Sequence, residues 1–161
     1  MKFIETAVIA QHPRDLEALM GFLEADRETV AGVEVYRFEI DTDLIALLYD
    51  FHPEKALPEA VLEHLNPHLE ALLLMVQKPF EETDRELAAH MNRIASTFSH
   101  LPTIMAVRIT PESLAALPAP IREQGLFLSS RGRMMFWHPS DRDSQARIWE
   151  MLWHQLPRHQ S

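Results

Sequence analysis

Three potential metal ligands alternate directly after the apolar run 44–49. They are Asp50, His52 and Glu54. Carboxylates and an imidazole can together hold a divalent cation, and functional residues of an α/β sheet gather beyond the carboxyl ends of its strands. Phe51 and Pro53 separate the three ligands, however, and no second ligand cluster accompanies them. The favoured interpretation is therefore a solvated loop without metal. A metal-dependent enzyme that uses these three residues is the weaker alternative.

Other combinations of potentially reactive residues give weaker evidence for a metal or catalytic site. His64 and His68 have the spacing of two ligands on one helical face, but Pro67 interrupts the helix between them, which favours a surface turn. Serines and nine histidines make a Ser-His-Asp triad arithmetically possible. No G-x-S-x-G elbow is present to position such a serine. The chain has no cysteine, which excludes disulfides, thiolate zinc sites and cysteine nucleophiles.

Length and charge narrow the function classes. The 161 residues allow one domain, expected over residues 1–157 with a short tail at 158–161, and 47% hydrophobic content provides a core. Fifteen basic and 24 acidic residues give a net charge of -9, which disfavours nucleic acid and anionic lipid as partners. No apolar run reaches the length of a membrane span, and no signal peptide opens the sequence. We expect a cytoplasmic protein.

Hydrophobic periodicity gives the order β-α-β-β-α-β-α-β-α-β-α. The predicted strands are 3–10, 33–40, 44–49, 71–76, 103–109 and 134–137. The predicted helices are 13–23, 56–65, 83–98, 110–117 and 140–156, with caps at Thr83, Thr110 and Ser140. This alternation predicts a three-layer α/β/α domain with a mostly parallel six-stranded sheet. Charges along 33–40 favour one antiparallel edge strand, with a bulge between Val35 and Tyr36.

The amino-acid sequences of three segments resemble those of a known protein family. Residues 33–44 form a hairpin around an acidic turn, residues 101–107 read Leu-Pro-Thr-Ile-Met-Ala-Val, and residues 141–144 open the last helix with Asp-Arg-Asp-Ser. In this order and spacing, over nearly the whole chain, they resemble a Ras-like small GTPase of the bacterial MglA-type branch. The resemblance implies a G-domain fold with its nucleotide site beyond the carboxyl ends of the strands.

The segment that should cradle phosphate is altered. After the first strand, the family's GxxxxGK[ST] loop is replaced by Gln11, His12, Pro13, Arg14, Asp15, Leu16 and Glu17. Pro13 removes one backbone N–H donor, and no glycine or lysine is available to surround a phosphate. Asp15 and Glu17 add negative charge at the helix end where the phosphate would lie. We interpret this segment as a degenerate P-loop.

The other nucleotide motifs are also degenerate. The family's DxxGQ corresponds to a segment in which Asp50 remains but Pro53 and Glu54 replace the Gly and Gln. The guanine-reading NKxD is absent from Arg108, Ile109, Thr110 and Pro111. Thr29 aligns with the switch threonine, although the short connection after the first helix indicates that a mobile switch loop has been lost.

Arginines and tryptophans leave two alternatives open. The arginines 108, 122, 131 and 133 either form a local anion site near the crevice or, as is more common, pair with surface acids. Trp137, Trp149 and Trp153 are most simply core, whereas outward-facing Trp149 and Trp153 would mark a partner surface.

The sequence thus predicts a nucleotide-free pseudo-GTPase, without cofactor or catalytic residues, that acts by contacting another protein. The resemblance suggests a Roadblock/LC7-type partner, and the candidate contact residues are Tyr36, Phe51, His52 and Lys55 with the adjoining helix. The alternative is an atypical GTPase that binds nucleotide weakly through other contacts.

Overall fold

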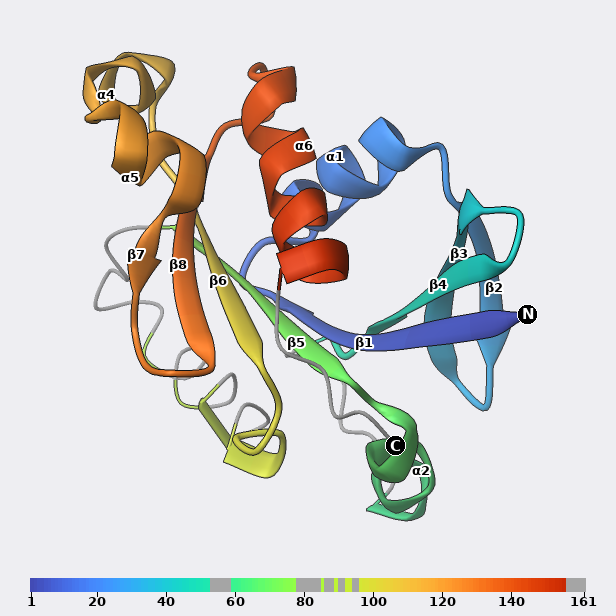
Figure 1. The fold of residues 1–161 in the computed structure, drawn as a ribbon. Coiled ribbons are helices and arrows are strands. Elements are labelled where there is room, and N and C mark those ends of the chain that lie inside the picture. Colours follow the sequence, from blue (N-terminus) through green and yellow to red (C-terminus); the bar gives the residue numbers. More distant parts are fainter. Residues whose placement is uncertain (53–58, 78–84, 86–88, 90–91, 94–95, 156–161) are drawn as a thin grey trace.

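A computed structural model describes residues 1–52, 59–77, 85, 89, 92–93 and 96–155 (Figure 1). Its strands form one sheet of eight in the order β2-β3-β4-β1-β5-β6-β8-β7. The strands are β1 (Lys2–Ala10), β2 (Asp26–Val30), β3 (Val33–Asp41), β4 (Leu44–Asp50), β5 (Ala71–Gln77), β6 (Thr103–Arg108), β7 (Leu126–Phe127) and β8 (Gly132–Trp137). The helices are α1 (Pro13–Leu23), α2 (Glu59–Leu65), α4 (Pro111–Ala116), α5 (Ala119–Gln124) and α6 (Arg142–Glu150).

The sheet is mostly parallel, as the sequence predicts. β4, β1, β5, β6 and β8 run parallel, whereas β2, β3 and β7 are antiparallel to their neighbours. The predicted count of six strands is two short. β2 is a mostly polar pentapeptide whose residues are all exposed, and β7 has only two residues, so neither shows the periodicity of a strand. Because β2 pairs with the outer side of β3, the sheet ends at β2 and not at β3 as predicted.

The predicted bulge between Val35 and Tyr36 is wrong. The pairing of β3 with β4 runs unbroken through both residues, and its irregularity lies between Glu39 and Asp41. Both side chains are buried because each face of β3 is covered. Val35 belongs to one hydrophobic core and Tyr36 to the other, on opposite faces of the sheet. Consecutive buried residues therefore need no extra residue in the strand.

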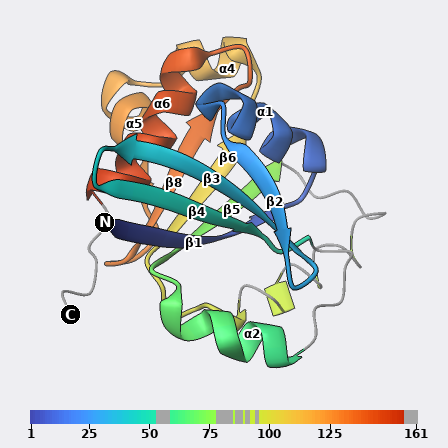
Figure 2. The same cartoon turned by 90° about the vertical axis from the view of Figure 1, so that its right-hand side faces the viewer.

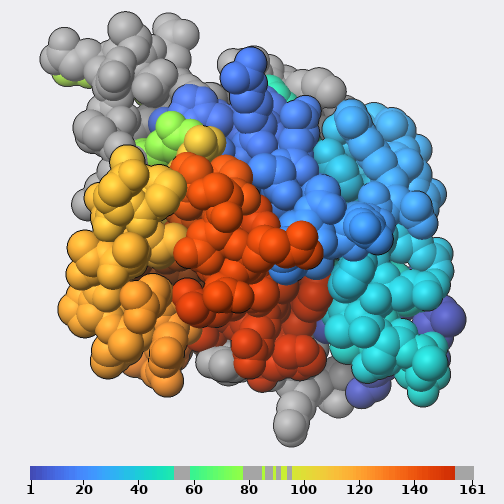
Figure 3. All heavy atoms as spheres, turned by 90° about the horizontal axis from the view of Figure 1, so that it is seen from above, coloured from blue at the N-terminus to red at the C-terminus, as the bar shows by residue number. Residues whose placement is uncertain are grey.

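Helices cover both faces of the sheet, which confirms the three-layer arrangement. α1 and α6 lie side by side on one face (Figures 1 and 3), and α2 lies on the other (Figure 2). Trp149 and Trp153 are 3% and 7% exposed and stack at 5.0 Å, and Trp153 also stacks on Phe38 at 5.4 Å. Both tryptophans are therefore core residues in the layer of α1 and α6.

Helix boundaries follow local chemistry. Thr110 caps α4 by accepting the Ser113 N–H at 3.2 Å, as predicted. Asp141, and not Ser140, caps α6, because its carboxylate accepts the Ser144 N–H at 2.9 Å. The last helix continues as a π-helix over Met151–Gln155.

Some expectations fall on residues that the structure does not describe. Most of the predicted helix 83–98 is among them, although Phe98 at its end is fully buried beside Phe51. The predicted helix 56–65 is described from Glu59 and ends at Leu65, where a 3-10 turn over Asn66–His68 follows. Leu156 and the tail 158–161 also lie outside the described residues. In the described part of the chain, no helix is both long and apolar enough to cross a membrane.

Candidate functional site

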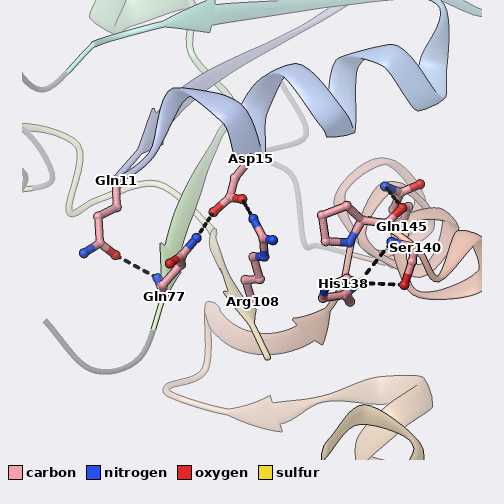
Figure 4. Close-up of polar contacts among 8 residues, drawn as sticks. Gln11, Asp15, Gln77, Arg108, His138, Ser140 and Gln145 are labelled. Carbon is pink, nitrogen blue, oxygen red and sulfur yellow. Dashed lines mark hydrogen bonds and ion pairs between the residues drawn. The ribbon is translucent and has the colours of Figure 1, made fainter. Parts of the chain in front are cut away.

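The connection between β1 and α1 is only two residues long. β1 ends at Ala10 and α1 begins at Pro13. Gln11 is buried at 3% exposure, and its N–H donates to the Met75 carbonyl at 2.8 Å. Its side-chain Oε1 accepts the Gln77 N–H at 2.7 Å (Figure 4). Gln11 is therefore tied to β5 through both main chain and side chain, and no loop remains here to surround a ligand.

A buried carboxylate occupies the first turn of α1. Asp15 is 1% exposed, and its Oδ1 accepts a hydrogen bond from Arg108 Nη1 at 2.6 Å. Its Oδ2 accepts one from Gln77 Nε2 at 3.1 Å, so both oxygens have partners (Figure 4). A carboxylate in this turn also interacts favourably with the helix dipole. We refer to Gln11, Asp15, Gln77 and Arg108 as the Asp15 cluster.

Sheet register brings this cluster together. Gln77 ends β5 and Arg108 ends β6, and the two are paired neighbours in the parallel ladder. Their side chains consequently project toward the same helix end. The sequence places Asp15 and Arg108 at the crevice, but their ion pair joins residues 93 apart in the chain, and no local pattern predicts it. Gln77 carries no motif signal and was missed.

The segment after β4 contributes an apolar side chain. Phe51 is fully buried, its N–H donates to the Val8 carbonyl at 2.9 Å, and its ring packs on Tyr49 and Phe98. His52, which follows, is partly buried. The other predicted residues of this segment, Pro53, Glu54 and Lys55, lie outside the described residues. In the part of the chain that is described, no three acidic or histidine side chains are grouped as metal ligands.

Of the predicted contact residues, Tyr36 and Phe51 do not present their side chains to solvent. They are 6% and 0% exposed, respectively. Burial raises the pKa of Tyr36, and the Arg27 guanidinium beside its ring opposes that effect. A partner at this edge of the sheet therefore meets β2 and not Tyr36.

A hollow of about 450 Å³ remains at the ends of β5, β6 and β8. It is lined by Gln77, Arg108, Ile109, Thr110, Pro111, Glu112, Ser113 and His138. Nδ1 of His138 lies 2.7 Å from Ser140 Oγ, and the Ser140 N–H also donates to it at 3.1 Å (Figure 4). This pair is a local turn of two residues and not a catalytic dyad, because no carboxylate of the described residues orients the imidazole.

The sequence left open whether the four arginines form an anion site or pair with acids, and in the described structure they do not gather into one site. Arg108 pairs with Asp15, whereas Arg131 lies at the opposite end of the sheet. It directly precedes β8, and its carbonyl accepts the N–H of Thr103, the first residue of β6. Arg133 is the second residue of β8. Because parallel strands start together, these two arginines lie at the pole away from the crevice.

A larger groove, of about 740 Å³, lies between α2 and the sheet. Apolar residues dominate its lining, which comprises Phe3, Glu5, Glu28, Val30, Ala31, Val35, Arg37, Leu47, Tyr49, Ala60, Val61, His64, Leu65 and His68. The rings of His64 and His68 meet edge to face at 6.0 Å despite the intervening Pro67. We call this the α2 groove. The sequence indicates the adjoining helix but not a groove, because the groove depends on the added strand β2.

The floor of the α2 groove holds one polar pair. Tyr49 OH donates to Glu5 Oε1 at 2.9 Å. Burial, together with this hydrogen bond and the Glu5 charge, raises the pKa of Tyr49 well above the ordinary value of tyrosine. The hydroxyl therefore stays protonated over the physiological range.

Comparisons with known proteins test the resemblance at the level of fold. No family model and no curated protein matches the sequence. Among solved structures, an Era variant of Aquifex aeolicus bound to GDP and AlF4- aligns with 99% of this chain at a TM-score of 0.57 and 11% identity. IFT22 of T. brucei in its GDP-bound form aligns with 97% at a TM-score of 0.50 and 14% identity.

The chain has a small-GTPase G-domain fold. It spans 59% of the Era chain and all of the IFT22 chain. At these identities the likeness concerns the backbone architecture alone. It confirms the predicted fold class and leaves the chemistry of the crevice to be argued from the residues that occupy it.

Proposed function

We propose that this chain is a nucleotide-free pseudo-GTPase that acts as a protein-interaction module. The Asp15 cluster is the observation that carries this proposal. In chain order, the segment from Gln11 to Glu17 corresponds to the phosphate loop of the G-domain fold. There the chain supplies a buried carboxylate, with both oxygens hydrogen-bonded by its own side chains.

Phosphate binding at this position would meet electrostatic and geometric obstacles. A phosphate about 5 Å from the Asp15 carboxylate is repelled by about 3 kcal/mol per charge at an effective dielectric of about 20. The Gln11 N–H already donates to Met75, and Pro13 has no N–H to offer. The Arg108 guanidinium, the one cation of the cluster, is committed to Asp15. The cluster thus takes up the donors that a phosphate would need.

The protein partner contacts the α2 groove in this proposal. Val30 and Phe3, which line it, are 53% and 47% exposed and leave apolar surface open to a partner. Apolar pockets with a few polar groups are common recognition sites. The groove includes the helix that follows the Asp50 to Lys55 segment, so the partner surface of the sequence analysis shifts onto α2 and β2. We propose that this partner is a Roadblock/LC7-type protein, as in the MglA-type relatives that the sequence resembles.

The hollow beside Arg108 favours a second candidate, an atypical GTPase with weak nucleotide binding. Its lining offers the hydroxyls of Thr110 and Ser113 and the imidazole of His138. In the described residues, however, no carboxylate other than Glu112 lines it, and the Thr110 and Ser113 side chains hydrogen-bond each other at 2.9 Å. The lining of this hollow therefore supports weak binding of a ligand that does not use the phosphate-loop position.

Calorimetric titration with magnesium and GDP, and then with a non-hydrolysable GTP analogue, separates the two candidates. The pseudo-GTPase predicts no saturable heat up to about 1 mM nucleotide. Saturation at micromolar concentration supports the atypical GTPase and overturns the first proposal. The purified protein should likewise release no nucleotide on denaturation.

The partner surface has its own test, with a purified Roadblock/LC7-type protein. Co-elution in size-exclusion chromatography is expected, and Val30→Asp should abolish it because a charge would enter the apolar groove. Thr29→Asp is the matched control: it adds the same charge to β2 on the other face, since neighbouring strand residues alternate. The assignment of the groove is contradicted if both variants lose co-elution equally, or if both still co-elute with the partner as the wild type does.

A further inference from the structure

The second edge of the sheet carries three consecutive exposed apolar side chains. Leu126, Phe127 and Leu128 are 42%, 75% and 47% exposed. Gly125 precedes them with φ +70, and this conformation turns the chain from α5 into β7. An added Cβ at Gly125 would overlap the Met134 carbonyl, so glycine is required there. The exposed triplet is thus held in place by the fold.

Two arginines accompany the triplet. The Arg133 guanidinium lies 4.2 Å above the centre of the Phe127 ring, and its Nη1 donates to the Gln124 carbonyl at 3.0 Å. Arg131 Nη1 lies 3.4 Å from the His100 carbonyl that accepts its hydrogen bond. Among the described residues, neither arginine forms an ion pair. We call Leu126, Phe127, Leu128, Arg131 and Arg133 the β7 patch.

This patch differs in charge from the rest of the chain. The protein as a whole has a net charge of -9. At this edge of the sheet, the guanidinium groups of Arg131 and Arg133 form no ion pair with the described residues and accompany exposed apolar side chains. Within an acidic molecule they therefore mark a surface that is complementary to acidic and apolar groups.

The backbone of β7 is open on one side. β7 ends the strand order, and its only pairing within the described sheet is with β8. The Leu128 N–H donates to the Gly132 carbonyl at 2.9 Å and so points toward β8, whereas the Gly132 N–H donates to the Ser129 carbonyl in the turn. Because the backbone groups of neighbouring strand residues point to opposite sides, the N–H and C=O of Phe127 point to the free edge.

We propose that the β7 patch receives an extended acidic segment of a partner protein, which adds to the sheet beside β7. The backbone of Phe127 would supply one donor and one acceptor. Leu126 and Leu128 would contact the alternate apolar residues of the segment on one face of the sheet, and Arg133, held over the Phe127 ring on the other face, would pair with its carboxylates, as would Arg131. An anionic membrane fits less well, since a bilayer extends beyond the patch and would face the acidic remainder of the molecule.

The test uses the whole chain and a fluorescent ten-residue peptide in which glutamate alternates with valine. Fluorescence anisotropy should show saturable binding that weakens as salt is raised. A peptide with lysine in place of glutamate should not bind, and one with a central proline should bind at least about tenfold more weakly, because proline cannot donate to the sheet.

Variants locate the binding. Phe127→Ser and Arg133→Glu should each weaken it about tenfold. Arg14→Glu is the matched control, with the same charge reversal on an exposed residue of α1, and should leave the affinity unchanged apart from a small long-range effect. Phe127 is mostly exposed, so its replacement should not unfold the protein, which circular dichroism can check.

Several results overturn the proposal. These are no saturable binding below about 1 mM, equal binding of the lysine peptide, or unchanged affinity in both patch variants. Co-sedimentation with phosphatidylserine vesicles that requires Phe127 would assign the patch to a bilayer instead. A dimer in sedimentation velocity that is lost in Phe127→Ser would assign it to a second copy of this chain.

Discussion

Arg108→Met should destabilise the fold through the carboxylate that it leaves behind. Asp15 is 1% exposed and would keep only the Gln77 amide as a side-chain donor. Removing one partner of a buried ion pair costs about 4 kcal/mol. The Arg108 side chain is 34% exposed, however, so water can partly replace it. We therefore expect a loss of about 2 kcal/mol in the free energy of unfolding, or about 6 °C in Tm.

A double-mutant cycle isolates the interaction between the two residues. Urea unfolding of wild type, Arg108→Met, Asp15→Asn and the double variant should give a coupling energy of about 1.5 kcal/mol. The double variant should be more stable than Arg108→Met, because no uncompensated charge remains buried. Arg27→Met is the control, since its ion pair with Glu34 is exposed and should contribute little. A coupling energy near zero, or a double variant less stable than both single variants, would refute the reasoning.

Other predictions concern the alkaline limit and two glycines. Because the pKa of Tyr49 is raised in the folded state, its contribution is complete below the unfolded pKa of about 10 and is lost as pH rises toward the folded value. Urea unfolding at increasing pH should show this loss, and Tyr49→Phe should reduce its slope. Gly125→Ala should cost at least about 3 kcal/mol because its Cβ meets the Met134 carbonyl, and little change in Tm would refute the strained turn. Gly21→Ala, in α1 with open space around it, should stabilise by about 0.7 kcal/mol, and destabilisation would contradict that space.

The architecture could be predicted because buried strands and amphipathic helices have strong periodicity. The runs 44–49 and 71–76 are continuously apolar, and both are central strands of a parallel sheet. β2 and β7 could not be predicted in the same way. β2 is mostly polar and has no hydrophobic pattern, because its side chains face solvent. β7 is apolar but has only two residues, which is too short to show the period of a strand.

The location of the site could be predicted from the sequence, but the side-chain contacts within it could not. The order of elements located the crevice at Gln11 to Glu17 and at Arg108, and the structure brings these two segments together. The role of Gln77 depends on the register of β5 against β6, which a single sequence does not specify. The arginines at 131 and 133 were assigned to the wrong pole, since they lie at the amino end of β8 and the crevice lies at the carboxyl ends of the parallel strands.

An NMR titration with magnesium and GDP tests the central claim most directly, because it observes the Asp15 cluster itself. The resonances to follow are the backbone amides of Gln11 and Gln77, the side-chain amide of Gln77 and the Arg108 guanidinium. If the Asp15 cluster occupies the position where a phosphate would bind, all of these resonances should stay unshifted up to about 1 mM nucleotide. Saturable shifts of these resonances at micromolar GDP would contradict the account.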